Sequence, residues 1–373
     1  MNWNISREEV KIMKGVAIVL IPLHNLLHMV GPLVRENEFY YNYPRRAYWM
    51  WNHITHLHPN VVGDAISFFG WYGVPVFMFL SGYGVMHKYG NPAEKCAAFR
   101  PFLRYNFLKL FRLMAPAFLL YCLIQMLFSN GQQTVVSFFT QLTLTNNILC
   151  NPKDIDPGVY WYFGITLQFY LLYRLLFHRK SNRVFWSLWA LLLAADTLWL
   201  ICMLPDPALK VQPQFEYIRH NAVGWFLPYF MGLGMGRLSL GPGSTCPEKN
   251  GHRNTLSRGA LCSGFVASVL LLSACSFQQQ LWLVTPVFAI TGTICLMRLI
   301  RHAWIGKMFG RLGTLSAYVF VVHPLVRPFF KEWIFLPGQL EIDVRGWFLA
   351  GLYLCLSVAL AYLYKVLISK IPY

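Results

Sequence analysis

The feature that most constrains this chain is a series of long apolar stretches, each long enough to cross a lipid bilayer as a helix. A bilayer core about 30 Å thick needs about 20 apolar helical residues. Only 13% of the residues are charged and 56% are apolar, which leaves too few charges to cover a soluble protein of this size. We therefore expect an all-α polytopic membrane protein, with about ten transmembrane helices in one domain over residues 1–373. The ten stretches lie near residues 12–34, 61–86, 107–128, 159–177, 184–204, 222–237, 258–276, 281–299, 311–329 and 346–368.

The charged residues outside these stretches predict how the chain is oriented. The formal net charge is +17. With ten spans both termini lie on one side, and 23 of the 32 Lys and Arg residues fall in the termini and loops of that side. Short loops that face the cytoplasm are enriched in Lys and Arg. We therefore expect cytoplasmic N- and C-termini, and the positive charge does not call for nucleic acid as a partner.

Two local patterns predict details of individual helices. Ser6 followed three residues later by Glu9 is a capping box, so the first helix should begin directly after Ser6. The short sixth stretch contains Gly232, Gly234 and Gly236. Small residues at this spacing let two membrane helices approach closely, so we expect this stretch to pack tightly against a neighbour.

Two histidines lie inside apolar stretches. His24 is about twelve residues beyond the start of the first stretch, and His323 is twelve residues beyond Arg311. At about 1.5 Å per residue, both lie roughly 18 Å deep, near the middle of the bilayer. Ionisable groups are costly there and usually serve a function. Each ring can simply donate a hydrogen bond within the packing, but the matched depth of the two favours a shared cavity.

The other histidines are weaker candidates for a site. His28 follows His24 by one helical turn, and such a pair can bind a metal ion. No acidic residue accompanies the pair in this stretch, so we expect no metal. His53, His56 and His58 lie in an outer loop, where they either line a substrate entrance or are simply solvated.

Basic residues near the predicted cytoplasmic side suit an anionic ligand. Lys14 precedes His24 by ten residues, about 15 Å along the helix axis, so only an elongated ligand reaches both. Lys14 can also be an ordinary lysine of the membrane interface. Arg104, Lys109 and Arg112 suit phosphate groups or lipid headgroups at the start of the third stretch. Arg112 lies five residues inside it, where a guanidinium offers bidentate phosphate binding.

Five short motifs follow one another along the chain. They are KGVAIVLIPLH (14–24), PVFMFLSGYGVMHKY (75–89), KLFRLMAP (109–116), WYFGITLQFYLLY (161–173) and LGTLSAYVFVVHPLV (312–326). Their order and spacing resemble those of the acyltransferase-3 family of integral membrane acyltransferases. The corresponding family patterns are a basic residue followed ten positions later by His, then FFxxSGF, RxxRIxPP, WxLxxExxFYL and LGxxSYxxYLxHxP. The resemblance spans essentially the whole chain.

This resemblance implies an activity and a set of site residues. Members of the family transfer acyl groups, usually acetyl, from cytoplasmic acyl-CoA to carbohydrates destined for the cell envelope. We therefore expect acetyl-CoA or another acyl-CoA as donor, a carbohydrate or glycolipid acceptor, contact with membrane lipids, no metal, and a place in the bacterial inner membrane. The residues assigned on this basis are His24 and His323 as catalytic, Lys14, Ser81, Arg104, Lys109 and Arg112 as donor-binding, and Trp161, Gln168 and Tyr170 as substrate-binding.

The chain departs from the family pattern in two positions. Thr166 stands where relatives often carry Glu, and Lys14 stands where Arg is common. A carboxylate role in the fourth motif is therefore not expected here. Because the sequence ends soon after the tenth stretch, we also expect no appended soluble domain.

The expected reaction is O-acyl transfer from a thioester to a hydroxyl. His24 removes the hydroxyl proton during attack and needs an open path from the cytoplasmic face. His323 can orient the acceptor, protonate the leaving thiolate or stabilise the oxyanion. Direct transfer is favoured over a transient acyl group on Ser81, which shows no base beside it. The alternative function is a proton-coupled transporter of a sugar or lipid-linked substrate, but the inverted repeats typical of such proteins are not visible.

Overall fold

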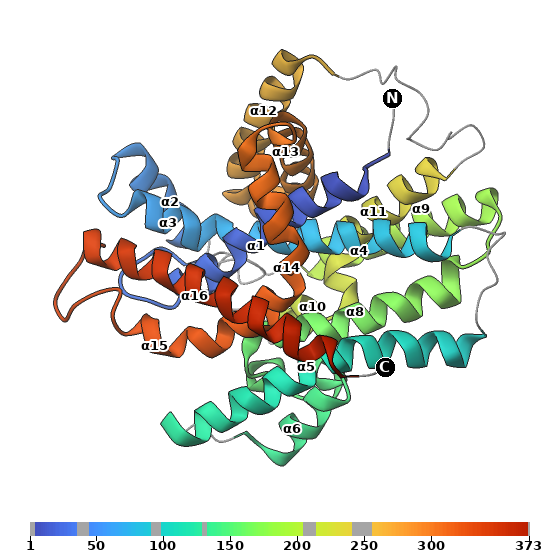
Figure 1. Cartoon of the computed structure of the whole chain (residues 1–373). Helices are drawn as coiled ribbons and strands as arrows, with labels where there is room; N and C mark the ends of the chain where they lie inside the picture. Colours follow the sequence, from blue (N-terminus) through green and yellow to red (C-terminus); the bar gives the residue numbers. More distant parts are fainter. Residues whose placement is uncertain are drawn as a thin grey trace.

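A computed structural model describes residues 4–35, 45–90, 98–128, 133–203, 214–240 and 256–371 (Figure 1). Within these ranges the chain is almost entirely helical and has no strand, so the expected all-α fold is confirmed. The α-helices are α1 Arg7–Leu27, α2 Arg45–Thr55, α3 Val61–Phe69, α4 Gly73–Tyr89, α5 Phe99–Phe128, α6 Val135–Leu142, α7 Asn146–Leu149, α8 Trp161–Leu172, α9 Asn182–Met203, α10 Gln214–Arg219, α11 Phe226–Ser239, α12 Arg258–Ser276, α13 Thr285–Ile300, α14 Trp304–Val326, α15 Pro328–Lys331 and α16 Val344–Ser369. Short 3-10 or π segments are η1 Gly70–Tyr72, η2 Pro152–Asp154, η3 Gly158–Tyr160, η4 Tyr173–Phe177, η5 Ala222–Trp225 and η6 Gln279–Val284.

Eight of the described helical segments are long and apolar enough to cross a membrane. They correspond to eight of the ten predicted stretches. The stretches near 159–177 and 222–237 form α8, of 12 residues, and α11, of 14 residues, which are shorter than the others. The total of ten spans therefore stays a prediction. The eight segments are Arg7–Leu27, Val61–Tyr89, Phe99–Phe128, Asn182–Met203, Arg258–Ser276, Leu281–Ile300, Trp304–Val326 and Val344–Ser369.

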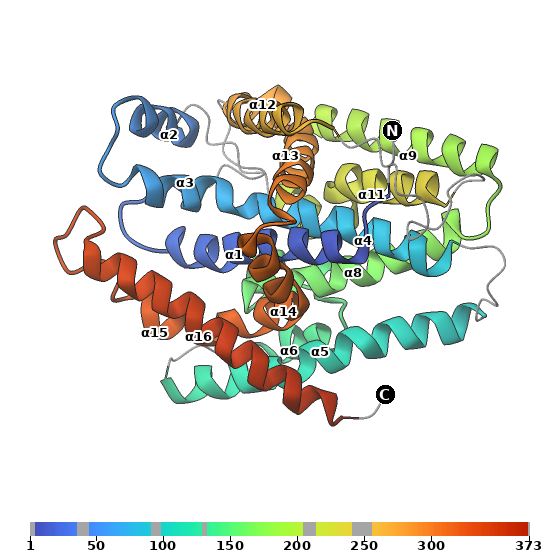
Figure 2. The same ribbon diagram turned by 45° about the horizontal axis from the view of Figure 1, so that its top comes forward.

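Helix α1 runs through the middle of the bundle, between α4 and α14 (Figures 1 and 2). The predicted capping box at its start is present, with the Ser6 N–H donating to the Glu9 carboxylate at 2.8 Å and the Glu9 N–H donating to Ser6 Oγ at 3.3 Å. The Glu9 carboxylate also pairs with Arg301 at 2.8 Å. This largely buried ion pair ties the start of α1 to the turn before α14.

The two ends of the chain point to the same side of the bundle. In both ribbon views the start of α1 and the end of α16 are directed toward the right-hand side, although they lie well apart there, and the end of α4 is on the same side (Figures 1 and 2). We call this side the N-terminal face. The opposite side, which carries α2 and the turn between α15 and α16, is called the distal face. An even number of spans requires such an arrangement, and the cytoplasmic location of the N-terminal face stays a prediction.

Glycines bring two pairs of helices into backbone contact. A Cβ atom on Gly15 would overlap the carbonyl oxygen of Phe309, and one on Gly313 would overlap that of Lys11. Helices α1 and α14 therefore cross with their backbones touching. A Cβ atom on Gly232 would likewise overlap a backbone carbonyl of α4, which confirms the close packing predicted for the sixth stretch.

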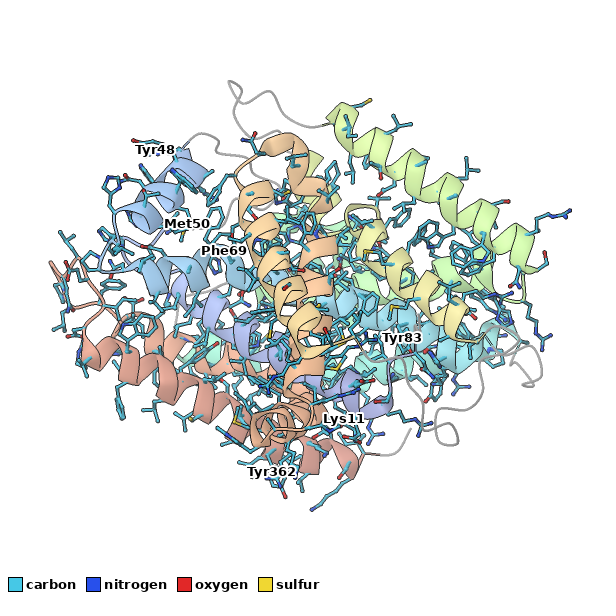
Figure 3. All side chains as sticks on the ribbon, turned by 90° about the horizontal axis from the view of Figure 1, so that it is seen from above. Lys11, Tyr48, Met50, Phe69, Tyr83 and Tyr362 are labelled. Atoms are coloured by element: carbon cyan, nitrogen blue, oxygen red, sulfur yellow. The ribbon has the colours of Figure 1, made fainter. Side chains whose placement is uncertain are left out.

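Helix α2 lies at the edge of the distal face and is attached by a few apolar side chains. Met50 is fully buried in a cluster with Phe68 and Val34, with Phe69 packed against it. Figure 3 shows Met50 and Phe69 beneath this helix, while Tyr48, 61% exposed, lies on its outer side. The cluster is small, so α2 relies on further contacts to hold its place.

The crossing of α1 and α14 yields a stability prediction. Gly313→Ala should lower the thermal unfolding midpoint in detergent, because the added methyl group overlaps the α1 backbone; overpacking of this kind costs about 1–3 kcal/mol. Gly351→Ala is the matched control, since a Cβ atom there meets nothing within 4 Å. Alanine is the better helix former by about 1 kcal/mol, so the control should be unchanged or slightly stabilised. Equal midpoints for the two variants would contradict a backbone contact at Gly313.

Candidate active site

A cavity of about 310 Å³ lies between five helices, α1, α4, α5, α8 and α14. Several of the predicted site residues, which are far apart in the sequence, meet in it. Its lining residues are Lys14 and Ile21 of α1; Val74, Phe77, Leu80, Ser81, Gly84, Val85, Lys88 and Tyr89 of α4; Lys109, Leu110 and Leu113 of α5; Tyr162, Phe163, Thr166 and Tyr170 of α8; and Ser316, Ala317 and Phe320 of α14.

Three lysines give one part of the cavity a positive charge. Lys14 is half-buried, whereas Lys88 and Lys109 are exposed. The Lys88 ammonium group donates a hydrogen bond to the Tyr105 hydroxyl at 3.3 Å and lies 4.3 Å from the centre of that ring. No Asp or Glu is among the described residues that line the cavity. An anionic group is therefore attracted to this part and meets no opposing charge on its walls.

Lys88 was not among the residues predicted for the site. From the sequence it is one of the charges that set the orientation, because its role in the cavity depends on side chains of α4 and α5 lying next to each other. A signal was present: Lys88 follows Ser81 by seven residues, which places both side chains on one face of α4. Both residues line the cavity.

Hydroxyl groups form a hydrogen-bonded wall on the α4 and α8 side. The Ser81 hydroxyl donates to the Phe77 carbonyl oxygen at 2.9 Å, so the Tyr162 hydroxyl donates to Ser81 at 3.2 Å. The Thr166 hydroxyl donates to the Tyr162 carbonyl oxygen at 2.7 Å. Because a backbone carbonyl holds the proton of Ser81, and no acid or imidazole lines the cavity, Ser81 is not arranged as an activated nucleophile.

The His24 ring is buried and oriented by hydrogen bonding. It is 5% exposed, and its Nδ1–H donates to the Ser67 carbonyl oxygen at 2.9 Å. A carbonyl oxygen only accepts hydrogen bonds, so the proton is on Nδ1 and the lone pair of the neutral ring is on Nε2. The His28 ring stacks on the His24 ring, with the two ring centres 4.7 Å apart. The arrangement fixes Nε2 as the atom of His24 that can accept a proton.

The His323 ring is arranged in the same way on α14. It is fully buried, and its Nδ1–H donates to the Val319 carbonyl oxygen at 3.1 Å. Its Nε2 has no hydrogen-bond partner among the described residues. A buried nitrogen with a free lone pair is costly, which indicates a place where a donor group of a ligand can bind.

Each histidine lies one helical turn beyond the last residue of its helix that lines the cavity. On α1 this last residue is Ile21, three positions before His24, and on α14 it is Phe320, three positions before His323. Three residues correspond to about 4.5 Å along a helix. The histidines therefore lie just past the inner end of the cavity. Among the described lining residues the cavity reaches along α1 only as far as Ile21, so the open path to His24 that the sequence predicted is not found there.

Comparison with known proteins identifies the family to which the chain belongs. Residues 7–366, nearly the whole chain, match the family model of the acyltransferase-3 family, which is described as an acyltransferase domain. The chain belongs to the acyltransferase-3 family. No match was found among curated proteins or among solved structures. The resemblance inferred from the five motifs is thereby confirmed, and the chain is a membrane acyltransferase.

Of the predicted donor-binding residues, the two arginines lie away from the cavity lining. Arg112 donates a hydrogen bond to the Ile368 carbonyl oxygen and so joins α5 to the end of α16. Arg104 is exposed on the first part of α5. The structure brings only Lys14, Ser81 and Lys109 of the predicted donor-binding set into the cavity.

The residues of the fourth motif, on α8, serve two purposes: some line the cavity and others pack against neighbouring segments. Tyr170 and Thr166 line the cavity, so the position where relatives carry Glu does face it. Trp161 is buried and stacks on Trp225 with the ring centres 5.5 Å apart. Gln168 lies outside the lining and joins α8 to the segment before α11. Its amide nitrogen donates to the Asn221 side chain at 2.7 Å, and its amide oxygen accepts the Ala222 N–H at 2.8 Å.

Gln168 therefore yields a prediction that separates packing from binding. Gln168→Leu should lower the thermal unfolding midpoint, because it leaves the Ala222 N–H unpaired at a cost of about 1–3 kcal/mol. The KM for substrates should stay unchanged, since both polar atoms already serve the fold. Thermal unfolding in detergent and steady-state kinetics check the two parts. A raised KM with an unchanged midpoint would instead assign Gln168 to the substrate.

Proposed function

We propose that this membrane acyltransferase moves an acyl group, with acetyl as the expected group, from a cytoplasmic acyl-CoA to a hydroxyl of an envelope carbohydrate in a bacterial inner membrane. The observation that supports this most is one cavity with three lysines in its lining and a buried histidine one turn beyond its inner end on each of two helices. A long donor with anionic groups at one end and a reactive thioester at the other matches this arrangement.

Donor binding depends on the lysines. The CoA moiety carries several phosphate charges, and Lys14, Lys88 and Lys109 can pair with them. Two of these lysines are exposed, so they reach the phosphates where the donor enters. The apolar side chains of Phe77, Leu80 and other lining residues then suit the uncharged arm that leads to the thioester.

The acyl transfer itself needs one base. His24 Nε2 takes the proton of the acceptor hydroxyl as its oxygen attacks the thioester carbonyl carbon. The tetrahedral intermediate then collapses: the carbon–sulfur bond breaks, the new ester remains, and the thiolate leaves with the CoA moiety and takes up the proton held by His24 Nε2, which returns the ring to its neutral form. The hydrogen bond from Nδ1–H to the Ser67 carbonyl also stabilises the imidazolium form, because a carbonyl oxygen lies against the charged ring.

His323 suits a positioning role on the acceptor. Because its Nδ1–H is held by the Val319 carbonyl oxygen, its neutral Nε2 accepts a hydrogen bond and does not donate one to an oxyanion. Among the three roles considered from the sequence, orientation of the acceptor agrees best with this tautomer, through a second hydroxyl of the carbohydrate, because the proton of the attacking hydroxyl goes to His24. The cavity must lengthen by about one helical turn past Ile21 and Phe320 for the reactants to meet both rings.

The role of His24 can be tested with an isosteric variant. His24→Asn keeps an N–H near the position of Nδ1, so the bond to the Ser67 carbonyl and the fold should persist, while the base is lost. We expect kcat to fall at least about 100-fold in a transfer assay with purified protein. His302→Gln, an exposed residue on the N-terminal face, is the control and should keep full activity. Wild-type kcat in His24→Asn would remove His24 from the reaction.

The role of the lysines can be tested by comparing acyl-CoA with acyl-pantetheine, which lacks the phosphates. Lys14→Gln and Lys109→Gln should each raise the KM for acyl-CoA roughly tenfold, equivalent to about 1.4 kcal/mol. The KM for acyl-pantetheine should not change. Lys11→Gln is the control, because Lys11 is three residues from Lys14 but pairs with Glu8 at 2.6 Å. Equal increases for both donors would show that the lysines do not bind phosphates.

A further inference from the structure

We propose that His53, His58 and Asp64 form a binding site for a divalent transition-metal ion of the Zn²⁺ class on the distal face. The site is separate from the cavity and does not rest on the proposed acyl transfer. It is made by the last turn of α2, the turn that follows it and the first turn of α3. The sequence alone predicted no metal and assigned these histidines to an entrance or to solvent.

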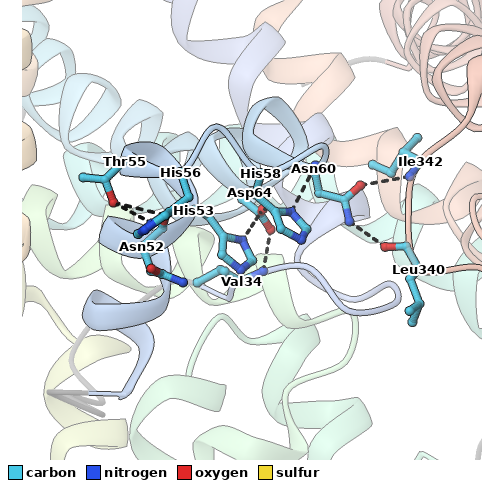
Figure 4. A network of polar contacts seen from close by, with 10 residues as sticks. All are labelled: Val34, Asn52, His53, Thr55, His56, His58, Asn60, Asp64, Leu340 and Ile342. Carbon is cyan, nitrogen blue, oxygen red and sulfur yellow. Dashed lines mark hydrogen bonds and ion pairs between the residues drawn. The ribbon is translucent and has the colours of Figure 1, made fainter.

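The three side chains lie close together. One ligand atom from each lies within 4.8 Å of the other two. Asp64 Oδ2 is 2.7 Å from His53 Nδ1 and 3.9 Å from His58 Nδ1 (Figure 4). Two imidazoles and a carboxylate are a ligand set that Zn²⁺ accepts, with water completing a tetrahedron.

The carboxylate of Asp64 needs a positive partner. It is fully buried, and its other oxygen, Oδ1, accepts the Val34 N–H at 2.8 Å. Within the described part of the chain, no Lys or Arg lies within 4 Å of it, and the two imidazoles are its only ionisable neighbours at that distance. A buried charge without a partner is strongly unfavourable. Neutral imidazoles carry no charge, whereas a divalent ion that these neutral rings bind compensates the carboxylate.

The turn that carries His58 is held in a specific and unusual shape. Leu57, 80% exposed, has a φ of 47°, in the left-handed region that residues other than glycine rarely adopt. Asn60 fastens the same turn to the segment before α16, donating to the Leu340 carbonyl oxygen at 2.7 Å and accepting the Ile342 N–H at 2.9 Å (Figure 4). Strained backbone of this kind persists where the surroundings fix it, and it gathers at binding sites. Here it turns the chain so that His58 lies back over His53.

Binding of an ion changes the packing of the two rings. They stack with their centres 4.0 Å apart, and the His58 Nδ1 accepts the Asn60 N–H at 3.2 Å. The nitrogen lone pairs lie in the ring planes, so His58 must turn out of the stack to share one ion with His53. The His58 side chain is 38% exposed and the His53 side chain 20% exposed, which leaves them room to turn. The ion would then join α2 directly to α3, in addition to the small cluster around Met50.

Metal titration of the full chain tests this site. The protein is purified in detergent with an affinity tag free of histidine, stripped with a chelator and titrated with Zn²⁺, while Co²⁺ serves as a spectroscopic probe. We expect one ion per chain, visible absorption bands of tetrahedral Co²⁺, and a higher thermal unfolding midpoint with Zn²⁺. His58→Gln and Asp64→Asn should each weaken binding at least tenfold. His56→Gln is the matched control, since the His56 ring is exposed and donates to the Asn52 carbonyl oxygen instead.

Several outcomes would overturn the proposal. A wild-type chain that binds no stoichiometric Zn²⁺ would show that protonated histidines alone compensate Asp64. Equal affinity in wild type and in His58→Gln would place any bound ion elsewhere. Since Asp64→Asn changes a buried residue, its thermal midpoint without metal is measured first, and the exposed His58 carries the test if Asp64→Asn does not fold.

Discussion

The arrangement of the candidate site depends on the backbone contact between α1 and α14. Gly15 and Gly313 allow these two helices to touch, and the Glu9–Arg301 ion pair secures the crossing from the N-terminal face. Lys14 precedes the first glycine by one position, and Ser316 follows the second by three, so both line the cavity close to the crossing. The same contact fixes the heights of the two buried histidines, which lie about ten residues further along their helices. Lys14 and Ser316, from the two ends of the sequence, thus line one cavity because Gly15 and Gly313 have no side chains, and the two imidazoles lie about one helical turn beyond it.

Patterns that involve a single helix were predicted well from the sequence. The apolar stretches gave the all-α fold, and the spacing of Ser6 and Glu9 gave the start of α1, because both depend only on neighbours along one helix. The tight packing at Gly232 was also predicted, because it depends on small residues within one helix, although the sequence did not identify α4 as the neighbour. The depth of the two histidines in the bilayer stays a prediction from helical rise, and both rings are buried within the protein.

Features that depend on which helices are neighbours could not be predicted in this way. A buried polar group in an apolar stretch needs a partner, and that partner can belong to a ligand or to another helix. For Arg112 a partner is the Ile368 carbonyl at the end of α16, and for Gln168 the partners are Asn221 and Ala222. One sequence does not distinguish these cases. Lys88 is the opposite case. From the sequence it looks like an ordinary lysine of the membrane interface, but it lines the cavity because α4 and α5 lie together.

The glycine crossing also determines which wall of the cavity can move. Two backbones in contact leave no side chains that could change rotamer between them, so α1 and α14 act as one rigid unit with their histidines. Any widening that admits a donor or an acceptor would then come from the other helices that line the cavity, α4, α5 and α8. Helix α8 runs into the π segment Tyr173–Phe177, and such departures from regular helix are frequent at functional sites. The two histidines would thus keep their positions while the facing helices move.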